Sequence, residues 1–200
     1  RVQTLGGFRV WRGAEPLDPR EWKREKARQL FQLLLTERRP WQREEITERL
    51  WPTLPPEAAG RDFKVALNAL FKAVEPARPA EAPSAFIARD GQTYQLRPEA
   101  DLWLDAAEFE RAAEAGLRLA EAGDSAASLL HLQAALQLYG GDYLPEALYE
   151  DWAAEARERL LALYLRAADR LAGLLVAQGR YEEGLAVCQL ILARDPCWER

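Results

Sequence analysis

The stretch EAAGRDFKVALNALFKAV, residues 57–74, repeats its apolar residues at helical spacing and precedes Glu75-Pro76, so it predicts a helix that ends there. At about 100° per residue, the apolar side chains gather on one side of this helix. The opposite side carries four polar side chains within about 80° of one another: Arg61, Lys64, Asn68 and Lys72. Such a helix can pack its apolar side on a domain core and expose a basic face that also bears an amide.

Short strands are predicted before this helix and a hairpin after it. Residues 1–17 alternate apolar and polar side chains around glycine turns, which is typical of strands. Two more helices are predicted, over 19–37, after an N-terminal cap at Asp18-Pro19, and over 42–51. FIARDGQTYQL, which starts at residue 86, predicts a β-hairpin that turns at Asp90-Gly91. Strands, three helices and a hairpin in this order predict an α+β winged-helix domain over 1–98, with its wing at 86–97.

The second half of the chain is predicted to be all α-helical, without strand signals. Helices are expected over 105–122, 125–139, 150–178 and 181–194. Turns at Gly123-Asp124 and Gly179-Arg180 join them into repeated helical hairpins, which form a second domain over 101–200. Because position 1 is Arg and the chain contains no Met, we expect a fragment, with further repeats after residue 200.

The charge of the chain is divided between its halves. Residues 1–100 carry 18 Lys and Arg against 14 Asp and Glu, whereas residues 101–200 carry 9 against 18, which gives balances of +4 and −9. The split suggests a polyanionic partner for the first domain, although +4 is also common for an enzyme domain. No apolar run is long enough to span a bilayer and no signal segment opens the chain, so we expect a cytoplasmic protein without membrane contact. Cys188, Cys197 and His131 lack metal-ligand spacing, so no metal or cofactor is expected.

The polar face of helix 57–74 has the chemistry of base recognition in duplex DNA. Lys and Arg donate to guanine O6 and N7, Asn pairs with adenine, and Val65 can contact a thymine methyl group. Arg89 lies beside the predicted tip of the hairpin and Arg97 at its far end, where a wing can meet phosphates or the minor groove. The alternative is a solvated helix face without a ligand, which surface helices also show.

Further cations flank the first predicted helix. Lys23, Lys26 and Arg28 can hold backbone phosphates, which would supply register and affinity without reading sequence. Alternatively, these cations pair with Glu21 and Glu25 and serve only the solubility of the helix.

Several longer motifs point to a known architecture. In the first half they are LGGFRV, REKARQLFQLLL, ITERLWP and GRDFKVALNALFKAVEP. In the second half they are LWLDAAEFERA, AALQLYGGDYLPEALYEDWAAEARERL and LAGLLVAQGRYEEGLAVCQLILARDP. Together they resemble the OmpR-type winged helix in the version fused to a bacterial transcriptional activator domain, as in antibiotic-pathway regulators of the SARP class. The resemblance covers nearly the whole chain.

This resemblance implies roles for particular residues. It implies that helix 57–74 is the recognition helix, and that a homodimer on direct repeats of double-stranded DNA activates transcription. It also implies that the loop after the second helix contacts RNA polymerase through Trp51, Thr53, Leu54 and Glu57. Relatives commonly hold arginine where Phe71 stands and basic residues where Ala69 stands.

For the second half, the resemblance implies an all-α, tetratricopeptide-like helical-repeat domain. Such hairpins make concave surfaces that bind a peptide or another domain. Four aromatic residues either line such a surface or anchor a long turn in the core: Tyr139, Tyr143, Tyr149 and Trp152.

Two functions from different classes follow from these features. The first is a sequence-specific transcriptional regulator that binds double-stranded DNA. The second is a protein-interaction scaffold or signal-sensing adaptor whose winged helix no longer binds DNA, which Phe71 and the acidic second half favour. An enzyme is not expected, because the chain has no P-loop, GxSxG or HExxH motif and only one histidine.

Overall fold

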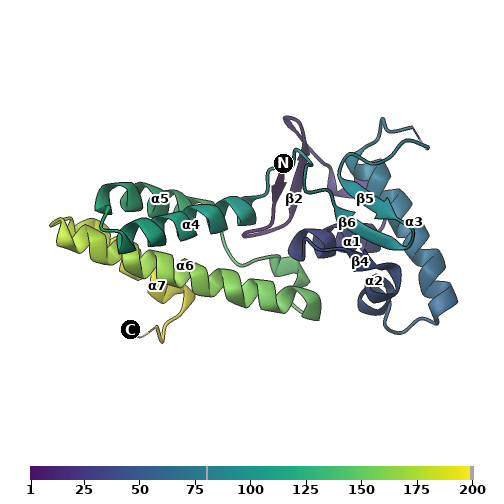
Figure 1. The fold of residues 1–200 in the computed structure, drawn as a ribbon. Coiled ribbons are helices and arrows are strands. Elements are labelled where there is room, and N and C mark those ends of the chain that lie inside the picture. The colour runs from purple at the N-terminus through teal and green to yellow at the C-terminus, as the bar shows by residue number, and fades with distance from the viewer. Residues whose placement is uncertain (80, 199–200) are drawn as a thin grey trace. The chain divides into compact units, whose positions relative to one another are not determined.

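The computed structural model describes residues 1–79 and 81–198, which form two compact units (Figure 1). The first unit contains Arg1 and residues 9–102. The second contains residues 2–8 and 103–200, of which the last two lie outside the described part. The domains expected over 1–98 and 101–200 differ from these units mainly in the segment 2–8, which a buried carboxylate binds to the second unit.

The helical part of the first unit opens with a short turn. A 3₁₀ turn, η1, covers Pro19–Trp22 and is capped by the side chain of Asp18, as the sequence predicts. The continuous helix expected from here is wrong, because Lys23 has a φ of +57° and ends the turn. The break allows Trp22 to enter the core, where its ring centroid lies 6.0 Å from that of Phe31.

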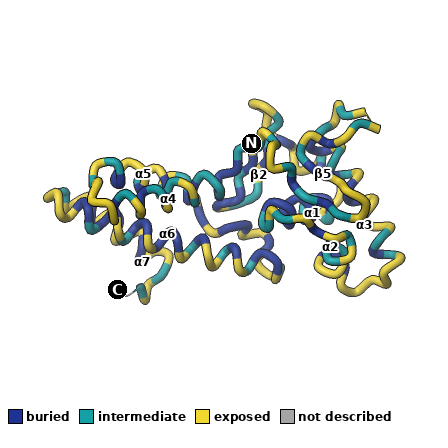
Figure 2. Tube along the Cα trace, viewed as in Figure 1, coloured by how far each residue is buried: buried dark blue, intermediate teal, exposed yellow. Residues whose placement is uncertain are grey.

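Three α-helices follow in the first unit: α1 (Glu25–Thr36), α2 (Arg43–Leu50) and α3 (Pro56–Val74). The helix predicted over 57–74 is confirmed as α3, and Pro56 suits its first turn, where no backbone donor is needed. Phe63 and Leu70 on its apolar side are fully buried, and α3 packs on α1 and α2. Along the tube in Figure 2, buried and exposed positions alternate on α3, so one side of the helix stays open to solvent.

The predicted wing forms one side of an antiparallel sheet with the strand order β4-β6-β5. Strands β5 (Ile87–Asp90) and β6 (Thr93–Leu96) form the hairpin, and Gly91 at its tip has a φ of +57°. Strand β4 (Trp41–Gln42) pairs with the other edge of β6. Two residues are too few to show a periodic pattern, so the sequence does not predict β4. A second hairpin consists of β2 (Arg9–Arg12) and β3 (Glu15–Pro16).

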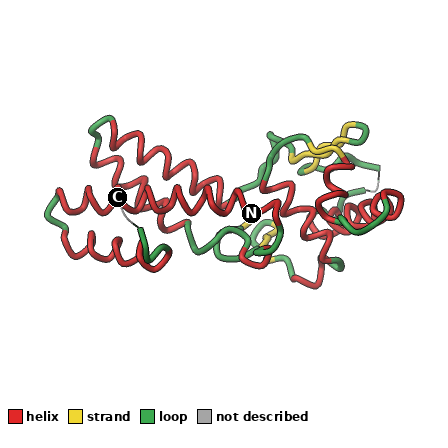
Figure 3. The backbone as a smooth tube through the Cα atoms, turned by 90° about the horizontal axis from the view of Figure 1, so that it is seen from below, coloured by secondary structure: helices red, strands yellow, loops and turns green. Residues whose placement is uncertain are grey.

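The second unit is built mainly from helices, drawn in red in Figure 3. Its elements are β1 (Val2–Gln3), α4 (Asp105–Glu121), α5 (Ser125–Leu138), the 3₁₀ turn η2 (Pro145–Ala147), α6 (Asp151–Ala177) and α7 (Tyr181–Arg194). The four predicted helices are confirmed. α4 packs on α5 and α6 on α7, and α6 also contacts α4 and α5. The two hairpin turns pass through Gly123 and Gly179, whose φ values are +84° and +76°.

A buried aspartate fastens segment 2–8 to the second unit. Asp105, the first residue of α4, is 3% exposed. Its carboxylate accepts hydrogen bonds of 2.8–2.9 Å from the backbone N–H groups of Thr4 and Leu5 and from the Thr4 hydroxyl. Burial raises the pKa of Asp105, and the hydrogen bonds from Leu5 and Thr4 act in the opposite direction. The first residues of the chain therefore belong to the second unit because this carboxylate satisfies their backbone donors.

Candidate nucleic-acid interface

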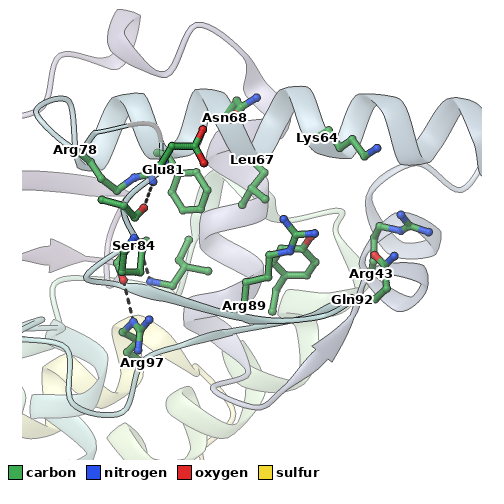
Figure 4. Close-up of a pocket in the computed structure, with 15 residues that line it drawn as sticks. Arg43, Lys64, Leu67, Asn68, Arg78, Glu81, Ser84, Arg89, Gln92 and Arg97 are labelled. Atoms are coloured by element: carbon green, nitrogen blue, oxygen red, sulfur yellow. Dashed lines mark hydrogen bonds between the residues drawn. The ribbon is translucent and has the colours of Figure 1, made fainter.

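A groove of about 710 Å³ lies in the first unit between α3 and the hairpin β5–β6 (Figure 4). Its lining includes five cationic side chains: Arg43, Lys64, Arg78, Arg89 and Arg97. Among the described residues of the lining, Glu81 provides the single carboxylate. Positive charge is therefore concentrated where helix and hairpin meet, although the whole chain carries a net charge of −5.

Helix α3 supplies one wall of the groove. Lys64 and Asn68 line it, because the apolar side of α3 packs on α1 and α2 and leaves these residues on the open side (Figure 4). Val65, which directly follows Lys64, is 41% exposed. Arg61 and Lys72 are exposed as well but lie outside the lining, one towards each end of α3. All five residues predicted on this face are thus accessible to a partner.

The hairpin supplies the opposite wall. Arg89 is exposed near the tip, where its Nε donates a 3.1 Å hydrogen bond to the Gly91 carbonyl. Arg97 lies at the base, where its Nε donates to the Ser84 carbonyl at 2.8 Å and its Nη1 lies 3.2 Å from the Glu99 carboxylate. The two arginines predicted on the wing therefore differ. Arg89 is presented at the tip, whereas Arg97 also holds the preceding loop in place.

Arg43 is a groove residue that the sequence does not reveal. It opens α2, and its backbone N–H donates a 2.9 Å hydrogen bond to the Gln92 carbonyl at the hairpin tip. Its guanidinium lies 3.0 Å from the Glu44 carboxylate and lines the groove beside Gln92 (Figure 4). The pairing of β4 with β6 brings α2 to the hairpin, and that pairing has no signal in the local sequence pattern.

The loop after α3 contacts Phe71, which stands at the position where the resemblance implies an arginine. The Arg78 guanidinium lies 4.4 Å from the centroid of the Phe71 ring, which is a cation–π arrangement. Both residues line the groove. A cation from the loop is therefore present at the end of α3, even though α3 itself carries an aromatic residue there. Ala69, the other departure, is half-buried.

The cations of segment 23–28 lie outside the groove. Lys23 is exposed, and the Lys26 ammonium lies 5.9 Å from the Trp51 ring centroid. The Arg28 guanidinium lies 2.6 Å from the Glu25 carboxylate. For Arg28, the structure therefore shows the pairing with a neighbouring glutamate that the sequence leaves open as an alternative to phosphate contact.

The residues implied as a polymerase contact lie in the loop between α2 and α3, except Glu57, which lies in the first turn of α3. Thr53, Leu54 and Glu57 are exposed, with Leu54 at 37%. Trp51 is only 7% exposed, so its ring is buried beneath the loop and presents little surface to a partner. A hollow of about 260 Å³ lies beside the loop, and Glu44 and Glu48 of α2 contribute to its lining.

The aromatic residues of the second unit separate into core and surface. Tyr139, Tyr143 and Trp152 are 2–5% exposed, and the Tyr139 ring lies 4.3 Å from that of Tyr164 in a stacked arrangement. Burial raises the pKa of Tyr139 to about 12. Tyr149 is 94% exposed. Three of the four aromatic residues therefore anchor the long turn in the core, and one is accessible.

Comparison with known proteins agrees with this architecture. Residues 104–200 match the family model of the bacterial transcriptional activator domain. A search of solved structures matches the fold of Mycobacterium tuberculosis EmbR, whose structure is described as a complex with a low affinity phosphopeptide, with a TM-score of 0.81 and 22% sequence identity. The match covers 98% of this chain and 50% of that one, so this chain spans half the length of the solved protein. Comparison with curated proteins found no match.

These findings confirm the predicted fold class, an α+β winged-helix domain followed by an all-α, tetratricopeptide-like helical-repeat domain. The family match over residues 104–200 also confirms the resemblance of the second half to a bacterial transcriptional activator domain. Among the described residues, no helix is long and apolar enough to cross a lipid bilayer.

Proposed function

We propose that this chain, whose residues 104–200 match the bacterial transcriptional activator domain, is a sequence-specific regulator that binds double-stranded DNA. In this proposal α3 enters the major groove, and the hairpin β5–β6 contacts the backbone or the minor groove. The observation that carries the proposal is the cationic groove between α3 and the hairpin. Its charge lies beside an exposed helix, which is the arrangement that a polyanionic duplex requires.

The exposed residues of α3 supply the chemistry for reading bases. The major groove of B-DNA is about 12 Å wide and admits one α-helix with its side chains. Lys64 can donate to guanine O6 and N7, and the Asn68 amide can donate to and accept from adenine. Val65 is exposed enough to contact a thymine methyl group. These contacts would distinguish one sequence from another.

The other cations of the groove supply contacts that do not depend on sequence. Arg89 at the hairpin tip and Arg43 at the start of α2 lie on the wall opposite α3 (Figure 4). Arginine forms paired hydrogen bonds with phosphate, so these side chains would fix the register of α3 on the duplex. The positive charge of the groove thus favours binding of DNA, even though the net charge of the whole chain is negative.

A binding titration against duplex DNA at several salt concentrations tests the proposal. Wild-type protein should bind a selected duplex with a log K that falls steeply with log salt. The double variant Lys64→Ala, Asn68→Ala should lose its preference for that duplex over random sequence. Arg9→Ala is the matched control, because Arg9 is an exposed cation of the same unit outside the groove. If wild-type protein shows neither affinity for duplex DNA nor salt dependence, the proposal is wrong.

The proposal extends to activation of transcription. The exposed side chains of Thr53, Leu54 and Glu57 would contact RNA polymerase, and two copies would bind direct repeats, where the second contact gains from high effective concentration. Leu54→Ala should lower transcription from a target promoter in vitro while DNA affinity stays unchanged. Equal transcription by the variant and the wild type would contradict the role of this loop.

A second candidate function is a protein-interaction scaffold that does not bind DNA. Leu148 and Tyr149 favour it, because they are 55% and 94% exposed within the acidic second half. Exposed aromatic residues are frequent anchors of protein interfaces. The salt titration separates the two candidates, since a scaffold of this kind would show no affinity for the duplex.

A further inference from the structure

The groove beside α3 contains one residue that is unexpected on a surface for a polyanion. Glu81 is exposed and lines the groove together with Lys64, Asn68 and Arg78. Among the described residues, none forms a hydrogen bond or an ion pair with the Glu81 carboxylate. Glu81 thus places a negative charge in a hollow that five cationic side chains line.

The loop that presents Glu81 is anchored on its C-terminal side. Glu75, which follows α3, accepts a hydrogen bond from the Ser84 hydroxyl and a 2.7 Å bond from the Ala85 N–H. Ser84 is 6% exposed, and its hydroxyl also accepts bonds of 3.1 and 3.0 Å from the N–H groups of Phe86 and Ile87. All of these hydrogen bonds join residues of the loop to one another or to residues that directly precede or follow it. They therefore hold the backbone near Glu81 against the C-terminal end of α3.

Two arginines fix the same loop from the groove side. Arg78 stacks on Phe71 and donates a hydrogen bond to the Ala82 carbonyl, one residue beyond Glu81. Arg97 donates to the Ser84 carbonyl from the base of the hairpin. Figure 4 shows Glu81 extending from this loop towards α3, on the side of the groove where Asn68 lies. The backbone that carries Glu81 therefore has a defined place beside the polar face of α3.

The chemistry of DNA limits what can approach such a carboxylate. A phosphate would be repelled, and the repulsion is strongest where water is displaced. A carboxylate instead accepts hydrogen bonds, and cytosine N4 and adenine N6 are the amino donors on the major-groove edges of the bases. Keto oxygens at the same position, from guanine or thymine, would leave the carboxylate desolvated and without a partner.

We infer that Glu81 is a specificity-determining residue, which selects, at one position of one DNA strand, a base whose major-groove edge carries an amino group, cytosine or adenine, next to the bases read by α3. This inference rests on the proposed function and deepens it. Glu81 adds little to affinity. It penalises duplexes that have guanine or thymine at that position of that strand, because a keto oxygen would then face the carboxylate. Its negative charge also weakens binding to DNA of random sequence.

Selection of bound duplexes from a random pool tests the inference, with wild type, Glu81→Gln and Glu15→Gln compared in parallel. Glutamine keeps the size of the side chain, but it donates as well as accepts, so it tolerates both amino and keto groups. Glu15→Gln removes the same charge from an exposed position of the same unit that does not line the groove. We expect the wild type and Glu15→Gln to prefer amino-bearing bases about tenfold at one position, and Glu81→Gln to lose this preference at that position alone.

A second measurement follows affinity for a duplex of random sequence. Glu81→Gln should bind it several-fold more tightly than either the wild type or Glu15→Gln, because the substitution removes a negative charge from the groove.

If the wild type selects a site and Glu81→Gln selects the same site with the same preferences, the inference is wrong while the proposed function stands. If the wild type selects no sequence at all, both fail. A loss of selectivity in Glu15→Gln equal to that in Glu81→Gln would also overturn the inference, since a general charge effect would then explain it.

Discussion

The groove beside α3 and the site around Asp105 both depend on charged side chains, but they use them in opposite ways. In the groove, Lys64 and Arg89 are exposed and lie on facing walls. Asp105 is 3% exposed, and its oxygens accept hydrogen bonds from Thr4 and Leu5. The first site keeps charge accessible to a ligand, whereas the second satisfies a charge within the fold.

This difference shows that the location of a charged side chain indicates its contribution to folding or to binding better than its sign or the number of charges does. A buried carboxylate contributes to folding, because removing it leaves its donors without partners in a low-dielectric environment. An exposed cation contributes little to folding, because water solvates it before and after unfolding. Variants at the two sites should therefore separate stability from DNA binding.

The largest effect is expected for Asp105→Ala. The change leaves buried N–H groups of Thr4 and Leu5 without acceptors, so the free energy of unfolding should fall by about 3 kcal/mol. Urea denaturation followed by circular dichroism measures it. Glu114→Ala is the control, because Glu114 is an exposed carboxylate on the same helix, 3.7 Å from Arg118, and its loss should change stability little. Equal stabilities of the two variants would contradict the role given to Asp105.

A smaller effect, on DNA binding and not on stability, is expected for Arg89→Ala. Loss of one phosphate contact should weaken duplex binding about fivefold and reduce the slope of log K against log salt by about 0.9. Titration at several salt concentrations gives both values, and Arg20→Ala, an exposed cation outside the groove, serves as the control. An unchanged slope in Arg89→Ala would show that the hairpin tip does not meet the backbone.

The smallest effect is expected for Arg28→Ala. Its guanidinium is already paired with Glu25, three residues before it on α1, and such pairs contribute only a few tenths of a kcal/mol. Duplex affinity and salt slope should remain within about twofold of the wild-type values. If Arg28→Ala instead reduces affinity as much as Arg89→Ala does, segment 23–28 contacts phosphates as well, and the cationic surface is larger than the groove.

Local sequence patterns were sufficient for most of the elements. The polar face of α3, the hairpin turn at Gly91 and the helices of the second unit follow from spacing, capping and turn chemistry. These are properties of residues a few positions apart, so periodicity reveals them. The same patterns identified Lys64, Asn68 and Arg89, because each lies on an element whose exposed side can be derived from its own sequence.

Only the tertiary structure decided which further residues line the groove together with Lys64, Asn68 and Arg89. Arg43 reaches the groove through the pairing of β4 with β6, and Arg78 and Glu81 reach it through a loop tied to Ser84. Segment 2–8 joins the second unit through Asp105, about a hundred positions away in the chain. Contacts between distant residues have no period in the sequence, since they depend on which surfaces remain to be buried once the helices and strands have formed. The amino-acid sequence by itself therefore determined the polar face of α3, and the packing of the chain determined the groove around it.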